Sequence, residues 1–430
     1  MQITFRDYVK TFPKLEKEFD NAAMCAMKWI YLYVHLGEGV VKGCHNVPHR
    51  YVTSDDIAKY GKDLFTNSEY EINTRREKLN NIKNPECQRC WSSESKNVRS
   101  CRLPEPYYKM HRDRFPEITN DLTPMPTMIE IAFNNTCDLK CIYCSSTFSS
   151  QWQTEDKKFN IVSKQQAVAP EGFEDIFWQW LEQDGSNTLL QYYILGGEPL
   201  IQPEFYNFID RFIPLIKANP NKFNVKPELV ILTNGNTPEK YLTKWFEKIK
   251  ELNEVVSIQF HISIEGYGNK AEYIRTNLDW DRFSSNVDKI LEFSKSGASE
   301  IRFSITHSAM SITSCLDLLQ WIKKLSDKHS IDVDLIRTSV VTPEHLAPCM
   351  LTPNFNTYID EVCSWIETDA PKWNHYIDFL KGIGNSFGKH SVADLKKFTA
   401  WEQDMVSRRN FKTKETFPEL ATWLEYCNEN

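Results

Sequence analysis

The strongest constraint on the fold is a long alternation of strand-like and helical segments between Thr127 and about Val341. Short apolar runs rich in β-branched and aromatic residues alternate there with segments of helical periodicity. Repeated βα units of this kind build a parallel sheet with helices on its faces. The sequence therefore predicts an α/β fold, a partial (β/α)6 TIM-like barrel. Six strands are expected, at Met128–Phe133, Leu189–Leu195, Glu228–Thr233, Val255–Ile264, Glu300–Thr306 and Ile331–Val340.

Helices are predicted after these strands, and several begin with the Pro or Thr that helix starts favour. They are expected at Phe173–Gln183, Pro203–Ala218, Pro238–Leu252, Asp279–Ser296 and Thr313–Asp327. Active residues of parallel α/β folds lie at the carboxyl ends of the strands. We therefore expect chemistry in the segments Asn134–Cys144, Gly196–Pro199, Asn234–Asn236 and Glu265–Arg275.

The flanking regions have a different character. A β-hairpin is predicted at Ala26–Val41, with its turn at Gly37-Glu38-Gly39, followed by a long polar helix at about Ser54–Asn81. The proline-rich stretch Asn84–Pro126 is expected to be a loop and linker, and the chain after Pro343 is expected to be helical. The domains expected are an N-terminal metal module at 1–111, a core at 127–345 and a C-terminal helical extension at 346–430.

Composition limits the class of protein. The chain has 430 residues, 41% of them hydrophobic, without the long apolar run of a membrane span or the opening blocks of a signal peptide, so we expect a cytoplasmic protein with no membrane partner. A net charge of −7 with interspersed signs argues against a nucleic-acid partner. Five of the twelve cysteines are closely spaced, three at 137–144 and two at 87–90, which in a reducing compartment indicates metal binding.

The first group is Cys137, Cys141 and Cys144, directly after a predicted strand. One loop can place these three thiolates around one metal centre. A four-iron cubane held by three protein thiolates keeps one iron open for a chelating substrate. The alternative is a structural zinc site, which would need a fourth Cys or His ligand, and none lies between Cys144 and His261.

This loop resembles the CxxxCxxC signature of the radical S-adenosylmethionine (SAM) superfamily, with aromatic Tyr143 before the last cysteine. The resemblance implies that Cys137, Cys141 and Cys144 hold a catalytic [4Fe–4S] cluster. It continues at the second strand end, where Gly196, Gly197, Glu198 and Pro199 match the family's GGEP motif. The motif implies that its backbone and carboxylate bind the amino group of SAM, a charge-assisted contact.

Two further elements extend the resemblance to about residue 340. Thr233-Asn234-Gly235 resembles the family's TNG element, which adds Asn234 to the expected SAM contacts. Ser263-Ile264-Glu265-Gly266 resembles its SxDG element, with Glu265 in place of Asp. The resemblance implies that Ser263, Glu265 and Arg275 contact the SAM ribose or carboxylate, and Arg suits a bidentate carboxylate contact.

The second group of cysteines lies upstream. A hairpin returns its ends to one another, so Cys25 before it and Cys44 after it can come close, and Cys87 with Cys90 can complete four thiolates. Four thiolates also suit zinc, so a zinc ribbon remains the alternative. Cys101 is a further candidate ligand, or a thiol without such a role.

This arrangement resembles the twitch or SPASM-type auxiliary-cluster module of radical SAM enzymes, here placed before the barrel. The resemblance implies a second [4Fe–4S] cluster on Cys25, Cys44, Cys87 and Cys90. With four protein thiolates such a cluster has no open iron, so its expected role is to accept an electron from a substrate radical.

The resemblance thus implies an oxidoreductase that cleaves SAM reductively to a 5′-deoxyadenosyl radical and oxidises a C–H bond of its substrate. Its substrate could be a peptide, a carbohydrate-like molecule or a small metabolite, and flavodoxin or ferredoxin would serve as reductant. Two alternatives remain open: a zinc-stabilised binding protein on a degenerate barrel, and a radical SAM group-transfer enzyme.

Overall fold

The computed structural model describes residues 3–4, 23–95, 122–162, 166–295 and 299–429. The chain divides into two compact units, each built from separated segments, and each is described by itself. Unit 1 comprises Met1–Asn134, Gln165–Ile231 and Lys248–Ile258. Unit 2 comprises Asn135–Lys164, Leu232–Glu247 and Gln259–Asn430. The division into an N-terminal module, a core and a C-terminal extension stays a prediction.

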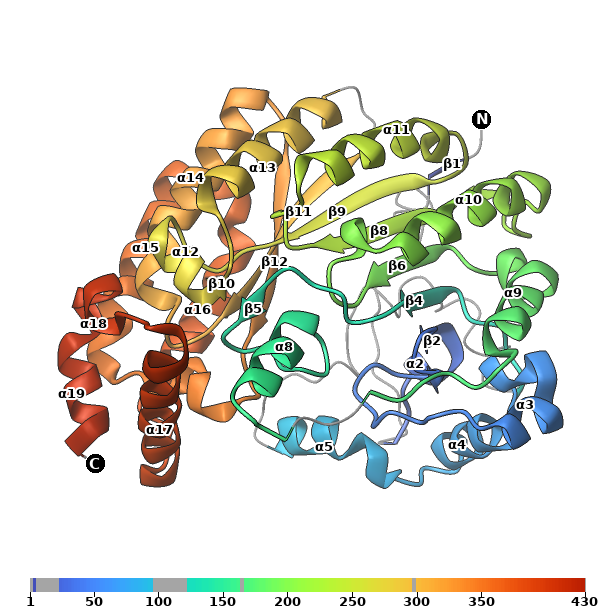
Figure 1. Cartoon of the computed structure of the whole chain (residues 1–430), viewed down its shortest axis with the longest axis horizontal. Helices are drawn as coiled ribbons and strands as arrows, with labels where there is room; N and C mark the ends of the chain where they lie inside the picture. The colour runs from blue at the N-terminus through green and yellow to red at the C-terminus, as the bar shows by residue number, and fades with distance from the viewer. Residues whose placement is uncertain (1–2, 5–22, 96–121, 163–165, 296–298, 430) are drawn as a thin grey trace. The chain divides into compact units, whose positions relative to one another are not determined.

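Unit 1 contains a sheet with the strand order β8-β6-β4-β2-β3 (Figure 1). Every neighbouring pair in this order is parallel except β2 with β3, which form the predicted hairpin. Tyr31 pairs with Met128, so the hairpin extends the sheet that contains the first strand of the predicted core. The strands are β2 (Tyr31–His35), β3 (Val40–Lys42), β4 (Met128–Ala132), β6 (Gln191–Leu195) and β8 (Glu228–Thr233), and a separate parallel pair joins β1 (Ile3–Thr4) to β7 (Val225–Lys226).

The core of unit 1 forms where apolar helix faces pack on these strands. The helix α10 (Pro203–Ala218) begins with a proline, which is tolerated in the first turn because that amide has no helical partner. Its buried Phe212 meets Tyr192 of β6 edge to face at 4.8 Å between ring centroids. The other helices of this unit are α2 (Met27–Ile30), α3 (Ser54–Tyr60), α4 (Glu69–Leu79), α5 (Gln88–Ser95) and α9 (Phe173–Gln183).

Unit 2 contains the parallel strand order β12-β11-β9, in which Phe303 of β11 pairs with Ile262 on one side and Leu335 on the other. A short antiparallel pair joins β5 to β10. The strands are β5 (Lys140–Cys141), β9 (Ser257–Ser263), β10 (Arg275–Thr276), β11 (Glu300–His307) and β12 (Val333–Ser339). The helices are α8 (Ser150–Lys158), α12 (Asn269–Ile274), α13 (Trp280–Ser294), α14 (Cys315–His329), α15 (Asn356–Asp369), α16 (Ile377–Gly384), α17 (Val392–Arg409), α18 (Thr413–Thr416) and α19 (Ala421–Glu429), while α11 (Glu239–Val255) runs from one unit into the other.

The predicted α/β class is confirmed, because the six expected strands are β4, β6, β8, β9, β11 and β12 and the five expected helices are α9, α10, α11, α13 and α14. The region after Pro343 is helical, as expected. None of the helices in the described part of the chain combines the length and apolar character that a bilayer span requires.

Three local predictions were wrong. The expected first strand of the hairpin begins instead as helix α2, because Trp29 and Ile30 pack into an apolar cluster from a helical turn. The long helix at Ser54–Asn81 is interrupted at Gly61, whose φ of +50° is incompatible with a continuing helix. The expected loop after Asn84 contains a 3-10 turn (Pro85–Cys87) and helix α5.

Candidate functional site

The loop that carries Cys137, Cys141 and Cys144 lies in unit 2 and is held by backbone pairing. Cys141 lies opposite Arg275 in the antiparallel pair of β5 with β10. The amide of Ile142 donates to the carbonyl of Ile274 at 2.9 Å. The amide of Cys144 donates to the carbonyl of Cys141 at 3.0 Å. The last two cysteines therefore occupy one tight turn at the end of a strand.

All three cysteines are half-buried, and hydrogen-bond donors lie near the sulfurs of Cys137 and Cys141. The Leu139 amide donates to Cys137 Sγ at 3.5 Å, Asn234 Nδ2 lies 4.0 Å from the same sulfur, and Arg275 Nη1 lies 3.9 Å from Cys141 Sγ. Burial raises the pKa of Cys141 to about 12, although Arg275 opposes the shift. Metal binding must therefore displace protons from this loop.

Arg275 joins three of the predicted site residues. Its Nε donates to Glu265 Oε2 at 2.6 Å and its Nη2 donates to Glu265 Oε1 at 2.7 Å. Nη2 also donates to the Tyr143 hydroxyl at 2.9 Å. Burial raises the pKa of Tyr143 well above its usual value, so this phenol stays neutral. The Glu265 carboxylate thus bonds two nitrogens of the guanidinium that lies beside Cys141.

The Thr233-Asn234-Gly235 segment is tied to the same loop through Asp138. Asn234 Nδ2 donates to Asp138 Oδ1 at 2.7 Å, and Asn236 Nδ2 donates to Asp138 Oδ2 at 2.8 Å. Ser263, also predicted, is half-buried at the end of β9 and lies opposite Ser304 in the sheet. Unit 2 therefore brings Asn234, Glu265 and Arg275 to the cysteine loop.

The sequence did not reveal a second set of side chains that contacts the backbone of this loop. Arg409, the last residue of α17, donates from Nη1 to the carbonyl of Lys140 at 2.8 Å and pairs through Nε with Glu155 at 2.9 Å. Its guanidinium lies 4.2 Å from the ring centroid of Trp152, whose Nε1 donates to the Cys141 carbonyl at 2.9 Å. No local motif signals this contact, because 269 positions separate Arg409 from Lys140.

The predicted Gly196–Pro199 motif lies in unit 1 as a turn after β6. Gly196 and Gly197 have φ values of +90° and +56°, which side chains on L-residues disfavour. Glu198 is fully buried, and its Oε1 accepts the amide of Leu200 at 3.2 Å. The Gly196 carbonyl accepts Gln202 Nε2 at 2.8 Å. Side chains of the turn itself therefore fix its backbone through these two hydrogen bonds.

The second cysteine group is brought together in unit 1. Cys25, Cys44, Cys87 and Cys90 line one pocket, in which Lys28 and Lys78 are further wall residues. Burial, with the neighbouring Cys44 thiol as the next cause, raises the pKa of Cys25 to about 12. Cys87 ends a 3-10 turn and Cys90 lies one helical turn further along, so both can face the same side. Cys101 lies outside the described residues.

The chemistry of the side chains around each cysteine group bears on whether it could hold an iron–sulfur cluster. The described residues include no group of three or more His, Cys, Asp or Glu side chains arranged to hold one metal ion. A cubane takes its thiolates at separate irons, and hydrogen bonds to its sulfurs stabilise it. Cationic or amide donors near Cys137, Cys141 and Cys87 supply such contacts. The residues of each group fit an anionic iron–sulfur cluster on this donor chemistry.

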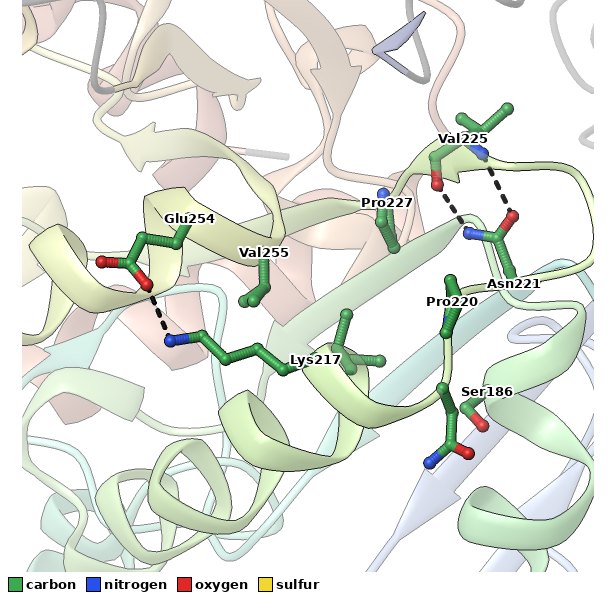
Figure 2. Close-up of a pocket in the computed structure, with 10 residues that line it drawn as sticks. Ser186, Lys217, Pro220, Asn221, Val225, Pro227, Glu254 and Val255 are labelled. Carbon is green, nitrogen blue, oxygen red and sulfur yellow. Dashed lines mark hydrogen bonds and ion pairs between the residues drawn. The ribbon is translucent and has the colours of Figure 1, made fainter. Parts of the chain in front are cut away.

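Another pocket of unit 1 contains none of the predicted residues (Figure 2). Pro227, at its wall, directly precedes β8, so the pocket lies at the amino end of that strand. Lys217 Nζ pairs with Glu254 Oε2 at 2.7 Å across it, and Asn221 bonds both backbone groups of Val225. Because active residues of parallel sheets lie at the opposite strand ends, we assign this pocket no chemistry.

Comparison with protein families gives one match. Residues 131–301 match the model described as the Radical SAM superfamily. This segment begins in β4 and ends in β11, and it includes the cysteine loop and the Gly196–Pro199 turn. The similarity to this superfamily therefore covers the part of the chain that holds the predicted cluster loop and the predicted SAM-binding turn. No curated protein sequence matches the chain.

Several solved structures are similar. SuiB of Streptococcus suis has 16% identity and a TM-score of 0.36, over 78% of this chain and 68% of that chain. SuiB bound to precursor peptide SuiA has 15% identity and a TM-score of 0.34, over 92% and 75% respectively. Native anSMEcpe with bound AdoMet has 15% identity and a TM-score of 0.39, over 57% and 62%.

Proposed function

We propose that this protein is a radical SAM enzyme that oxidises a C–H bond of a peptide or carbohydrate-like substrate. The observation that carries the proposal is the pairing of β5 with β10, which puts Arg275 beside Cys141 in the predicted cluster loop. The family match to residues 131–301 supports it. When bound to Cys137, Cys141 and Cys144, a reduced [4Fe–4S] cluster supplies the electron that cleaves SAM to methionine and a hydrogen-abstracting 5′-deoxyadenosyl radical.

The residues of the chain have separate parts in this proposal. Arg275 offsets the negative charge of the thiolates, and Glu265 fixes its guanidinium through two hydrogen bonds. Asp138 holds Asn234 and Asn236 against the loop. Tyr143 stays protonated, and its hydroxyl oxygen accepts a hydrogen bond from Arg275 without adding charge.

The proposed SAM contacts are those of the sequence motifs. They are Tyr143, Gly196, Gly197, Glu198, Pro199, Asn234, Ser263, Glu265 and Arg275. Gly196 and Gly197 have left-handed conformations and no side chain, so SAM could approach their backbone amides closely.

A second proposed site is an auxiliary [4Fe–4S] cluster on Cys25, Cys44, Cys87 and Cys90, which would take one electron from the substrate radical. Their common pocket supports it. Flavodoxin or ferredoxin is the proposed reductant for SAM cleavage.

The test is 5′-deoxyadenosine formation by anaerobically reconstituted protein with SAM and dithionite, with iron and zinc counted on the same samples. We expect product, about eight irons per chain for two cubanes, and loss of product in Cys141→Ala. The matched control is Cys427→Ala, a buried cysteine outside both groups, which should keep both product and iron. Stoichiometric zinc without product would overturn the proposal in favour of a zinc-stabilised binding protein, and S-adenosylhomocysteine as a further product would indicate group transfer.

A further inference from the structure

Two buried lysines line the pocket of the four upstream cysteines. Lys78 of α4 is fully buried and Lys28 of α2 is 3% exposed. A buried ammonium is costly unless a negative or strongly polar partner compensates the lost hydration. The charge of these lysines is therefore informative about what the pocket holds.

Both lysines have partners at the pocket. Lys28 Nζ pairs with the Glu71 carboxylate at 3.4 Å. Lys78 Nζ lies 3.2 Å from Cys87 Sγ and 5.1 Å from the ring centroid of Trp91. A cysteine sulfur that is bound to iron keeps much of its negative charge. Lys78 is thus positioned to compensate a metal-bound thiolate.

We propose that Lys78 is a positioning residue that raises the reduction potential of the auxiliary cluster and makes it an electron acceptor. This inference rests on the proposed function. An oxidised cubane on four thiolates is already a net anion, and an added electron makes it more negative. A cation at hydrogen-bond distance from a ligand sulfur stabilises the reduced form more than the oxidised form, because net charge and hydrogen bonds to sulfur set the potential of such clusters.

The electron balance of the proposed step is simple. The substrate, after losing a hydrogen atom to the 5′-deoxyadenosyl radical, gives up one electron to the auxiliary cluster and one proton to solvent. The substrate is thereby oxidised by two electrons in total, and the cluster is reduced by one. An oxidised one-electron carrier of the flavodoxin or ferredoxin class then removes that electron.

The other polar groups near this pocket differ from Lys78 in charge or exposure. Arg89 also lines the pocket, but its side chain is exposed, so solvent screens its charge. The Asn46 amide donates to Cys44 Sγ at 3.4 Å, a neutral hydrogen bond that carries no full charge. Lys83 also lies 5.1 Å from the Trp91 centroid, but its side chain is exposed and it does not line the pocket. Lys83 is therefore a matched control for removing a cation from the same aromatic ring.

The experiment is a redox titration followed by electron paramagnetic resonance on the full chain carrying Cys137→Ala, Cys141→Ala and Cys144→Ala, so that only the auxiliary cluster contributes. Lys78→Met and Lys78→Gln remove the charge, Lys78→Arg retains it, and Lys83→Met is the control. At a fixed potential we expect the reduced-to-oxidised ratio to fall at least tenfold in Lys78→Met, which is about 59 mV for a one-electron couple. Lys78→Arg and Lys83→Met should change the ratio by less than threefold.

The outcomes separate this inference from the function on which it rests. If the background protein binds no iron, or binds zinc, the auxiliary cluster itself is wrong and the role of Lys78 falls with it. If the cluster forms and neither Lys78→Met nor Lys78→Gln changes the ratio, the role of Lys78 is wrong while the auxiliary cluster stands. Lys78→Gln decides the case if Lys78→Met does not retain iron, because it keeps an N–H donor at that position.

Discussion

Arg275 and Glu265 form a buried ion pair with two short hydrogen bonds, and the same guanidinium lies 3.9 Å from Cys141 Sγ. Glu265 is 1% exposed and Arg275 is 5% exposed, so water cannot replace either partner. The pair links the segment after β9 to the cysteine loop, and its loss should affect the fold as well as the chemistry.

We predict that Glu265→Gln lowers the free energy of unfolding by about 3–5 kcal/mol, because it leaves the Arg275 charge buried without its anion. The midpoint of urea unfolding measures this. The control is Glu254→Gln, which breaks the exposed pair with Lys217 and should shift the midpoint far less. Equal shifts in the two variants would contradict a special role for burial.

Arg409→Met is predicted to weaken the cluster loop. The substitution removes the donor to the Lys140 carbonyl and the pair with Glu155, whose side chain is 4% exposed. We expect a lower iron content, by up to about four irons per chain, with the remaining iron on the upstream cysteines. Arg211→Met is the matched control, since Arg211 also pairs with a glutamate and lies 4.3 Å from a tryptophan centroid but is 48% exposed. An unchanged iron content in Arg409→Met would show that the cysteine loop does not depend on Arg409.

The turn after β6 should tolerate no side chain at Gly196. A Cβ there would lie 2.8 Å from Ala132 Cβ, and φ is +90°. We predict that Gly196→Ala costs about 1–3 kcal/mol in backbone strain alone. Gly382, in α16, has open space around it, so Gly382→Ala should be neutral or stabilise by about 0.4–1 kcal/mol. The midpoint of thermal unfolding of each variant measures the difference. A higher midpoint in Gly196→Ala would contradict the expected backbone strain.

Stability should fall as the pH decreases from 6.5 to 4, in part because of His307. Burial lowers the pKa of His307 to about 4, so the unfolded chain binds a proton in this range while the folded chain does not. Stability is therefore lost on acidification, by about 3 kcal/mol for this group. His307→Gln should show a flatter slope of urea midpoint against pH. His35 and His45, with pKa values also lowered to about 4 by burial, should preserve the rest of the slope. An unchanged slope would exclude His307 as a contributor.

The strands and helices of the βα region could be predicted because each depends on local pattern. The predicted bounds of α9, α10 and β8 agree with the structure to the residue. Amphipathic periodicity and terminal Pro or Gly act within a few residues, so the sequence carries that information locally. The spacing of Cys137, Cys141 and Cys144 is equally local, whereas Cys25 and Cys44 could be grouped with Cys87 and Cys90 only through the predicted hairpin and a family resemblance.

Errors arose where packing overrode local preference. The segment Trp29-Ile30-Tyr31 was expected as strand, since all three residues favour strands. Trp29 and Ile30 instead belong to helix α2 and pack in the apolar cluster. Helix α8, which supplies Glu155 and Trp152, was not predicted because it is polar along most of its length. Its Glu155 and Trp152 make tertiary contacts with Arg409, which lies far away in sequence, and such contacts supply stability that helix propensity does not.

The sequence by itself determined the α/β class, the order of the strands along the chain and the residue types available for cluster and SAM chemistry. Only the tertiary structure decided that Glu265 pairs with Arg275 beside Cys141, that Lys78 faces Cys87, and that the N-terminal hairpin extends the sheet through β4. The physical reason is that periodicity and spacing are set by neighbours in the chain, whereas the partner of a buried charge is chosen by which distant groups burial brings within hydrogen-bond distance.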